Sequence, residues 1–278
     1  MRRNNEERLM GVHKPSHPED VPQMMNPMDF VTPTQFVELP SCGRYPEGHP
    51  LHGKDSIEIK YMTAKDEDIL TNRSLLKKGL AIDRMIQNLI VDKSINARSL
   101  YVGDRNSIII HARAMAYGSD YKTSVQCPAC GETSKTRFDL SDYEIYKGNE
   151  IEDYLQDNGD GTFTTRLLLA DQIVARIRPL SGADEVELLG DGSAKDMTKD
   201  LLSKQMKRFI VDLNGYSDDR TINYVVENMV AADAKHLRDC LKQISPDVKL
   251  EQQFRCKNCD HKEVMTVPFG TDFFWPDR

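Results

Sequence analysis

Two cysteine pairs of identical spacing are the residues of this sequence best suited to chemistry. Cys127 and Cys130 form one Cys-x-x-Cys, and Cys256 and Cys259 form the other. Each pair follows a strand-like stretch and precedes another, which indicates a β-hairpin with two thiolates at its turn. Four thiolates are the closed tetrahedral set of a structural zinc, a borderline-soft ion without a geometric preference of its own. The sequence therefore predicts one structural zinc ion bound by all four cysteines.

The spacing between the two pairs is unusual, because residues 131–255 lie between them. A compact zinc ribbon has only about 15–20 residues between its cysteine pairs. A whole region is therefore inserted into the ribbon, and closing a loop of this length with a metal removes on the order of 4 kcal/mol of chain entropy. Two local disulfides, a redox Cys-x-x-Cys and unrelated thiols remain alternatives. His261 could replace a cysteine ligand, although a polar turn residue is the preferred interpretation of it.

Several other residues carry metal-like or reactive groups, and each has a structural interpretation. His49 and His52 lie in a loop without further ligands nearby, so we expect them to be structural. Residues 157–161 look superficially like a calcium loop but lack the closing glutamate, which favours a hairpin turn. Cys240 lies on the apolar side of a predicted helix and is expected to be a core residue. Cys42 lies in a turn and has no evident role.

Composition excludes several classes of protein. The 278 residues are 39% hydrophobic and 29% charged, with a formal charge of −7, which is the profile of a soluble globular chain. An acidic chain is a poor general nucleic-acid binder, and no run reaches the ~20 apolar residues of a membrane span. The N-terminus has no signal-peptide pattern, so we expect the cysteines to stay reduced until they bind metal. No catalytic motif is present, so the sequence predicts that the chain is not an enzyme.

The predicted fold class is α+β: zinc-ribbon β-hairpins that staple a largely helical inserted region, with an extended N-terminal arm. Residues 1–35 form the proline-rich arm, which we expect to lie on a partner because it cannot bury enough apolar surface to order itself. Residues 36–126 form an N-terminal α+β region. Residues 127–278 form the zinc-ribbon domain with an inserted hairpin and helical bundle.

Apolar periodicity and turn residues predict the individual elements. The strands are expected at residues 36–39, 56–62, 121–126, 133–140, 167–169, 173–179, 248–255 and 261–267. The helices are expected at 66–70, from Asn72 or Ser74 to 91, from Asp104 to Gly118, from Ser181 to Gly190, and at 200–213, 219–230 and 233–244. Residues 191–194 are expected to be a flexible link.

A succession of short motifs resembles a known family. It comprises Phe36-Val37-Glu38-Leu39-Pro40-Ser41, Gly43-Arg44-Tyr45-Pro46, the stretch 59–70, Cys-Pro-x-Cys-Gly, Arg176-Ile177-Arg178-Pro179-Leu180, the second Cys-x-x-Cys and the closing Val-Pro-Phe-Gly-x-x-Phe-Phe-Trp-Pro. In this order, over residues 36–276, the sequence resembles the baseplate hub subunit family of T-even-type contractile-tailed bacteriophages. The resemblance implies a structural or assembly role in the virion's tail baseplate, put together in the host cytoplasm, without catalysis.

The predicted function is that of a structural component or assembly factor that docks with other baseplate and tail proteins. The N-terminal arm and the C-terminal aromatics are the expected contacts. In an extended tail, Phe273 and Trp275 would share one side and Phe274 the other. One side is expected to pack on the ribbon near Phe254 and Phe269, and the other to face a neighbour.

Two alternatives to this function remain. The first is a zinc-ribbon adaptor or nucleic-acid-associated module of a cellular complex, for which Arg255, Lys257 and Lys262 supply only a thin basic surface. The second is a zinc-dependent hydrolase, which would need a metal position open to water.

Overall fold

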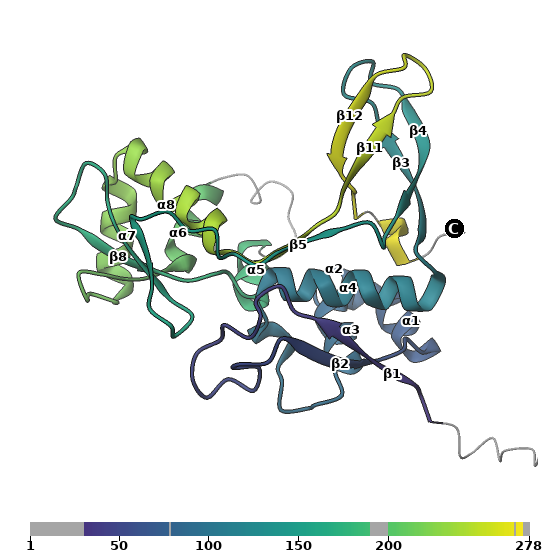
Figure 1. Cartoon of the computed structure of the whole chain (residues 1–278), viewed down its shortest axis with the longest axis horizontal. Coiled ribbons are helices and arrows are strands. Elements are labelled where there is room, and N and C mark those ends of the chain that lie inside the picture. The colour runs from purple at the N-terminus through teal and green to yellow at the C-terminus, as the bar shows by residue number, and fades with distance from the viewer. Residues whose placement is uncertain (1–30, 78, 190–199, 270, 275–278) are drawn as a thin grey trace, which may run out of the picture. The chain divides into compact units, whose positions relative to one another are not determined.

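The structure, a computed structural model, describes residues 31–77, 79–189, 200–269 and 271–274 (Figure 1). The chain separates into two compact units, Met1–Thr32 and Pro33–Arg278, and all the elements described below belong to the second. The predicted arm and the predicted link at 191–194 lie largely outside the described residues. The second unit confirms the mixed α+β class, because helices and antiparallel strands alternate along it.

The N-terminal part of this unit packs a two-stranded sheet against helices. Strands β1 (Thr34–Glu38) and β2 (Ser56–Lys60) pair antiparallel, with Val37 opposite Ile57. Alternation puts Ile57 and Ile59 in the core, as the period-2 pattern of residues 56–62 predicted, and Val37 of β1 is buried beside them. The helices that follow are α1 (Ala64–Thr71), α2 (Arg73–Lys77), α3 (Ala81–Leu89), the short 3-10 helix η3 (Ala97–Ser99) and α4 (Val102–Tyr117).

The single helix predicted from Asn72 or Ser74 to residue 91 is wrong, because two helices occupy this stretch. Asn72 caps the first one, α2, by accepting the N–H groups of Ser74 and Leu75. Gly79 then adopts a positive φ of 66°, a conformation that ends helices. The apolar stripe belongs to α3, which buries Met85, Ile86 and Leu89.

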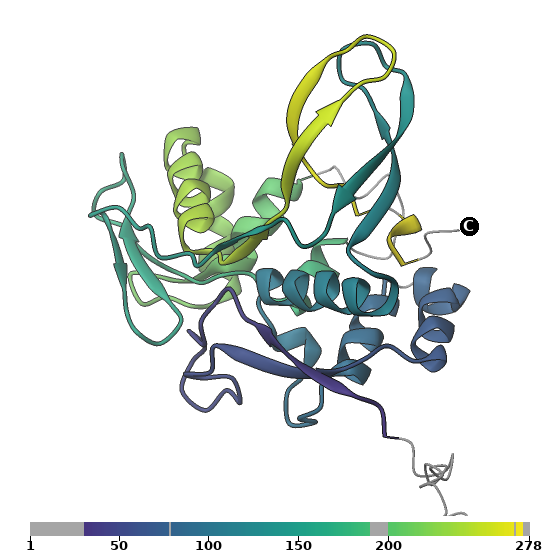
Figure 2. The same cartoon turned by 45° about the vertical axis from the view of Figure 1, so that its right-hand side comes forward.

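Two β-hairpins form the ribbon. The first pairs β3 (Asp120–Gln126) with β4 (Thr133–Asp139), and the second pairs β11 (Glu251–Arg255) with β12 (Lys262–Thr266). Figures 1 and 2 both show the hairpins side by side. At their base, β5 (Glu144–Tyr146) pairs with β10 (Asp247–Lys249). The strand predicted at 248–255 is thus divided at Leu250, where the chain leaves β5 and joins the second hairpin.

Where the structure describes it, the inserted region combines a sheet with four helices. The strands β6 (Leu155–Asp157), β7 (Phe163–Arg166), β8 (Val174–Ile177) and β9 (Ile210–Leu213) form an antiparallel sheet in that order. The helices are α5 (Gly182–Leu189), α6 (Leu201–Phe209), α7 (Asp219–Asn228) and α8 (Ala231–Ile244). Residues 157–161 form the predicted hairpin turn between β6 and β7, closed by a bond from Asn158 N–H to Thr162 C=O.

Two predictions within the inserted region are wrong. The helix predicted at 200–213 ends at Phe209, and Ile210–Leu213 becomes strand β9 because it pairs with β8. Residues 167–169 are not a strand but a loop between β7 and β8, in which Leu168 and Leu169 are exposed. Both changes follow from sheet pairing, which a local apolar pattern does not reveal.

The buried apolar residues form two clusters. The first core collects residues from β1 to β4 and from β10 to the C-terminal end, and includes Val37, Ile59, Met85, Tyr121, Phe138, Phe254 and Phe273. The inserted core lies between Leu155 and Ile244 and includes Phe163, Ile177, Phe209, Leu237 and Cys240. The two regions meet at the start of α4, where Val102 N–H donates to Leu180 C=O at 3.0 Å and Tyr101 forms a β-bridge with Ser181.

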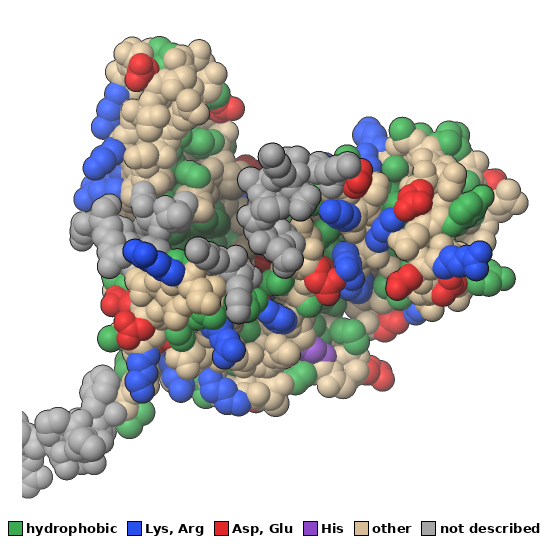
Figure 3. Space-filling view, turned by 180° about the vertical axis from the view of Figure 1, so that it is seen from behind, with side chains coloured by type: hydrophobic (Ala, Val, Ile, Leu, Met, Phe, Trp, Pro, Cys, Tyr) green, Lys and Arg blue, Asp and Glu red, His purple; other side chains and the backbone are tan. Residues whose placement is uncertain are grey.

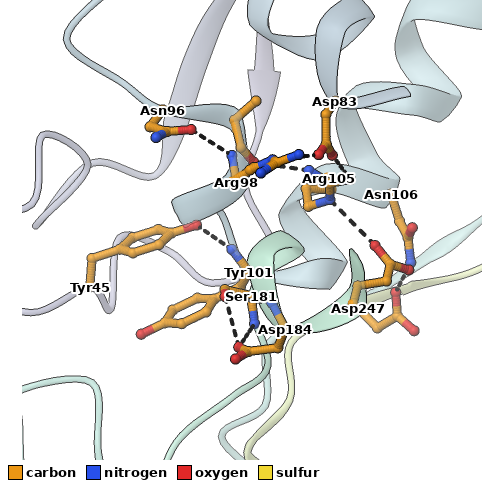
Figure 4. A network of polar contacts seen from close by, with 12 residues as sticks. Tyr45, Asp83, Asn96, Arg98, Tyr101, Arg105, Asn106, Ser181, Asp184 and Asp247 are labelled. Carbon is orange, nitrogen blue, oxygen red and sulfur yellow. Dashed lines mark hydrogen bonds and ion pairs between the residues drawn. The ribbon is translucent and has the colours of Figure 1, made fainter. Parts of the chain in front are cut away.

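Polar contacts surround the start of α4, and Figure 4 shows several of them, among them Tyr45 Oη with Tyr101 N–H and Arg105 with Asp83. Asp104, expected to open the helix, lies inside its first turn and accepts bonds from Ser41 N–H, Ser41 Oγ and Tyr45 Oη. Burial raises the pKa of Asp104. Arg105, only 4% exposed, donates to Asp83 at 2.7 Å. These contacts therefore fix α4 against both the N-terminal loop and α3.

Candidate metal centre

The two cysteine turns have the same backbone construction. Cys127 N–H donates to Glu132 C=O, and Gly131 N–H donates to Cys127 C=O, both at 2.9 Å. The second turn repeats the pattern with Cys256, Asp260 and His261 at the same relative positions. Gly131 and Asp260 both have positive φ, 74° and 56°. Each hairpin therefore ends in a turn that directs two thiols toward those of the other hairpin.

Asp260 is an uncommon residue for a positive φ, and its side chain is held in place. A non-glycine residue in the left-handed region costs free energy, although aspartate tolerates it better than most residues. Arg255 donates from Nε and Nη2 to Asp260 Oδ1, at 3.1 and 2.8 Å. This pair connects the end of β11 to the turn it enters.

Apolar side chains between the hairpins bring the two turns together. Val125 and Phe254, each two residues before a cysteine pair, are 3% and 1% exposed. Tyr121 and Phe138 extend the same buried layer toward the hairpin bases. Gln252 links the hairpins by accepting Asp139 N–H, at 3.0 Å, and donating to Asp139 C=O. The strands thus place the turns side by side.

The four cysteines predicted from the spacing form one cluster. Their Sγ atoms all lie within 4.8 Å of one another. Two of the contacts join different hairpins: Cys127 Sγ lies 3.8 Å from Cys259 Sγ, and Cys130 Sγ lies 3.7 Å from Cys256 Sγ. All six cysteines of the chain are free thiols, so local disulfides do not account for the pairs. The cluster is suited to binding a metal ion.

The cluster is half inside the molecule. Cys127 and Cys256, the first cysteine of each pair, are 1% and 0% exposed, whereas Cys130 and Cys259 are exposed. The inner sulfurs belong to the first core, and the outer pair lies at the ribbon tip. A metal ion at this site would be bound by two buried and two exposed cysteines, and would join the tips of the two hairpins.

The environment favours ionisation of one thiol first. The Glu132 N–H and the Asn258 side chain lower the pKa of Cys130 to about 6. The pKa of Cys259 is raised to about 12 although His261 N–H acts to lower it, because Cys259 shares protons with the other three thiols. Thiolates are the metal-binding form, so the cluster offers one ligand readily and releases further protons as metal binds.

Asn258 contributes to the site and was not singled out from the sequence. Its backbone N–H donates to Cys256 Sγ at 3.4 Å, and its Nδ2 reaches Cys130 Sγ of the other hairpin at 3.7 Å. Ala129, at the matching position of the first turn, has no side-chain donor. The feature of the sequence that could have indicated this role is an asparagine, a side-chain hydrogen-bond donor, between the two cysteines of a pair.

Among the described residues, the histidines considered as ligands, His49, His52 and His261, do not join the cluster. His49 stacks on Tyr45 and contacts Ser99 Oγ at 2.9 Å, and His52 contacts Tyr45 C=O at 2.6 Å. These contacts confirm the structural interpretation of both. His261 lies 3.2 Å from Glu263 as a polar turn residue.

Of the two remaining cysteines, Cys240 is 0% exposed and lies in the inserted core, as predicted. Burial raises its pKa to about 11, so it is not a reactive thiol at neutral pH. Cys42 has a positive φ of 49° in its turn.

The C-terminal aromatics differ from the expected extended arrangement. Thr271–Phe274 form a short 3-10 helix, η4, and Phe273 and Phe274 are both buried, at 2% and 5%. Phe273 contacts Phe269, with ring centroids 4.7 Å apart, so the predicted packing near Phe269 is confirmed. The expectation that Phe274 and Phe273 face opposite sides is wrong, because the helical turn buries both. Trp275 lies outside the described residues.

Arg113 holds this segment, and no local pattern in the sequence predicts this role. It is 0% exposed, donates from Nε to Phe273 C=O at 2.5 Å and from Nη1 to Gly118 C=O at 2.9 Å. Burial lowers its pKa. The arginine thus connects α4 to the C-terminal end of the described chain.

Basic residues are present on the ribbon but partly neutralised. Figure 3 shows Lys and Arg side chains along one side of it. In the first hairpin the exposed ones are Lys122, Lys135 and Arg137, and Arg137 pairs with Asp120 at 2.6 Å. Within the described residues, no helix is both long and apolar enough to cross a bilayer.

Comparison with known proteins gives one result. No curated protein and no solved structure matches the chain. A protein family does match: residues 34–275 correspond to the family described as T4 bacteriophage base plate protein. This match favours the phage interpretation over the cellular adaptor. By this match the protein is a structural component of a phage baseplate that assembles with other baseplate proteins. The family description does not specify the hub subunit. The chain belongs to the T4 bacteriophage base plate protein family.

Proposed function

We propose that this protein is a non-enzymatic part of the baseplate hub whose two hairpins are joined by one structural zinc ion on Cys127, Cys130, Cys256 and Cys259. One observation carries the metal assignment. Sulfurs from two hairpins more than a hundred residues apart lie 3.7 and 3.8 Å from each other. A tetrahedral ion with Zn–S bonds of about 2.3 Å separates its ligands by about 3.8 Å.

The donor set supports zinc in particular. Four thiolates select zinc or iron–sulfur centres among the common biological metals. The compact spacing of the sulfurs suits a single ion. With all four positions taken by sulfur, no position remains for a water molecule, so the site has a structural role and no hydrolytic one.

The ion would fix the ends of the inserted region. Residues 131–255 leave the first hairpin and return at the second, and the metal closes that loop at the ribbon tip. Metal binding energy would then contribute directly to folding, as it does in other structural zinc sites. The result is a rigid part that can dock within a larger assembly.

Partner contacts form the second element of the proposal. The proline-rich arm, residues 1–35, would lie along another baseplate or tail protein, because its composition does not support a core of its own. Fewer C-terminal residues than expected are free to contact a partner protein, since Phe273 and Phe274 are buried in this chain. The C-terminal contact rests on Trp275 and on Phe269, which is 46% exposed. The division into 1–35, 36–126 and 127–278 remains part of the proposal.

Elemental analysis of the purified, unchelated protein tests the metal site. We expect one zinc per chain, lost in Cys256→Ser and retained in Cys240→Ser, a matched control whose thiol lies in the inserted core. A folded wild-type protein with no metal, or with iron instead, would contradict the zinc assignment.

The hub position is tested separately by a mass-spectrometric census of purified virions and of isolated hubs. We expect the protein at a fixed low copy number in both. Its absence from virions would make it an assembly factor, and its presence only in peripheral baseplate fragments would exclude the hub.

A further inference from the structure

We propose that an apolar groove on the inserted region binds the apolar face of an amphipathic helix from another baseplate protein. The groove has a volume of about 340 Å³ and lies between α7 and the loop that joins β7 to β8. Leu169, Ile173, Tyr224, Met229 and Val230 are among its lining residues. The proposal goes beyond the metal site and does not depend on it.

One wall of the groove is the loop between β7 and β8, in which two leucines are exposed to solvent. Leu168 and Leu169 are 58% and 70% exposed, whereas the preceding Leu167 is 3% exposed and anchored in the inserted core. Asp233, only 1% exposed, accepts the N–H groups of Leu169 and Ala170 at 2.8 and 3.2 Å. A buried carboxylate thus fixes the loop backbone at Leu169 and Ala170, in the conformation that leaves the Leu169 side chain exposed.

The helix side presents a matching apolar face. Tyr224 is 69% exposed and Val230 is 49% exposed, with Val225 and Met229 forming the floor on the inserted core. Asn228, the polar residue of this wall, donates its side chain to Tyr224 C=O at 2.8 Å. Tyr224, Val225 and Asn228 share one side of α7, and Met229 follows as the C-cap residue of this helix.

The chemistry of the lining excludes a charged ligand. Asp233 is the one ionisable acid or base among the lining residues, apart from the Tyr224 phenol, and both its oxygens are already engaged by the loop. The groove therefore offers apolar contact and the Tyr224 hydroxyl. Exposed apolar patches bounded by polar residues are typical of protein interaction sites.

The size of the patch argues against a second copy of this chain as the occupant. Leu169, Tyr224 and Val230 are the most exposed large apolar residues of the lining, and together they present no more than a few hundred Å² of apolar surface, because even a large aromatic side chain offers only ~150–250 Å². A self-sufficient dimer interface needs about 800 Å² from each partner. The patch suits one or two turns of a helix that has further contacts elsewhere in the baseplate.

A helical occupant follows from the shape of the groove. One wall is the exposed side of α7, and a second helix can lay its side-chain ridge against the ridge formed by Tyr224 and Asn228. Helix-in-groove recognition uses apolar anchors at i, i+3, i+4 and i+7, and a cavity of this volume admits a few such side chains. Leu169 would then contact the opposite flank of the bound helix.

Site-specific photocrosslinking tests the partner. The full-length chain carrying benzoylphenylalanine in place of Tyr224 is added to baseplate precursors that lack this protein, and crosslinked peptides are identified. The matched control places the probe at Tyr216, which is 64% exposed and outside the groove lining. We expect crosslinks from position 224 to a helix of one other baseplate protein, at least about tenfold above position 216.

Three outcomes would overturn the proposal: crosslinks to a second copy of this chain, crosslinks of equal yield at both positions, or none from position 224. Substitution gives an independent measurement. Leu169→Asp should reduce incorporation into baseplates about tenfold or more without changing the melting temperature, while Leu202→Asp, at a 57% exposed position on α6, should not. If Leu169→Asp lowers the melting temperature, Leu169→Ser replaces it, and full incorporation of that variant would equally reject the groove.

Discussion

The two hydrophobic cores of this protein are closed in different ways. The inserted core uses residues from one continuous stretch, Leu155 to Ile244. The first core combines residues from Val37 to Leu140 with residues from Val248 to Phe274, which enter after the whole insertion has been traversed. One core is therefore local in the chain, and the other depends on the return of the C-terminal segment.

This difference explains why the first core contains stabilising contacts between residues far apart in the sequence. Non-local contacts carry a larger loop-closure entropy than local ones, so they need additional stabilisation. In the first core it comes from Arg113 on the Phe273 carbonyl, from Gln252 between the hairpins and from the cysteine cluster. No comparable link is needed where the chain supplies all its partners within one stretch.

Loss of the metal should produce the largest difference in stability between the two cores. In the zinc proposal, Cys256→Ser removes a ligand, and the binding contribution at a free metal concentration of 1,000 Kd is about 4 kcal/mol. We expect the hairpin amides around Val125 and Phe254 to lose hydrogen-exchange protection, while those around Leu237 keep theirs. Because thiolates bind the metal, chelators should act faster as pH falls.

The control for that experiment is Cys240→Ser, which should disturb the inserted core and leave the hairpins protected. Uniform loss of protection in Cys256→Ser would contradict the difference between the cores, since it would mean that they unfold as one unit.

The junction between the cores should be sensitive to one methyl group. A Cβ on Gly103, at the start of α4, would lie 1.9 Å from Pro246 C=O and 2.7 Å from Asp247 Cα. Backbone atoms on the connection from α8 to β10 would have to move, so Gly103→Ala should cost about 1–3 kcal/mol in urea unfolding and affect both cores.

Gly159→Ala is the comparison for Gly103→Ala. Gly159 has a positive φ of 77°, but a Cβ added there would have no atom within 4 Å. The substitution should cost about 1 kcal/mol through backbone conformation and affect the inserted core alone. Equal effects of the two variants on the first core would show that close approach at Gly103 is unimportant.

Acid should loosen the same junction through Asp184. This carboxylate caps α5 by accepting Ser181 N–H and Oγ and pairs with Arg178 at 2.7 Å. Burial acts to raise the pKa of Asp184, but the bonds from Arg178 and Ser181 outweigh it and lower the pKa. Because the folded-state pKa lies below the unfolded one, the stabilisation is complete above the ordinary aspartate pKa and is lost as pH falls through the folded value.

Replacing the carboxylate checks this sign. Asp184→Asn should lower stability at neutral pH by about 1 kcal/mol and flatten the acid limb of the stability profile. An unchanged acid limb would assign the pH dependence to other groups.

The smallest effect is expected at the cysteine turns. Asn258→Ala removes the side-chain bond to Cys130 Sγ, which is a weak hydrogen bond to an exposed sulfur. Bound metal should be extracted by a chelator about two- to fivefold faster, with unfolding little changed, because bonds of this kind are individually weak. Lys257→Ala, at the neighbouring exposed position, is the control, and equal extraction rates in the two variants would reject a role for the amide.

Local chemistry in the sequence determined the centre of this protein. The cysteine spacing, the alternating strands around it and the choice of a hairpin turn at 157–161 all depend on residues a few positions apart. The same holds for the end of α4 at Gly118, whose φ of 82° together with a ψ of 167° is a backbone conformation that essentially only glycine adopts. The order of short motifs along the chain also indicated the phage baseplate family.

Only the tertiary structure decided the elements whose partners lie far away. Ile210–Leu213 continues a helical apolar pattern, yet it is a strand because β8 offers it a pairing edge. Phe274 is buried because Arg113, more than 150 residues earlier, holds the neighbouring carbonyl of Phe273. Leu169 is exposed because a buried Asp233 binds its backbone. Periodicity reports which side chains are apolar, but burial and pairing are set by which surfaces the folded chain brings together, and a strand edge or a buried charge has no local signature.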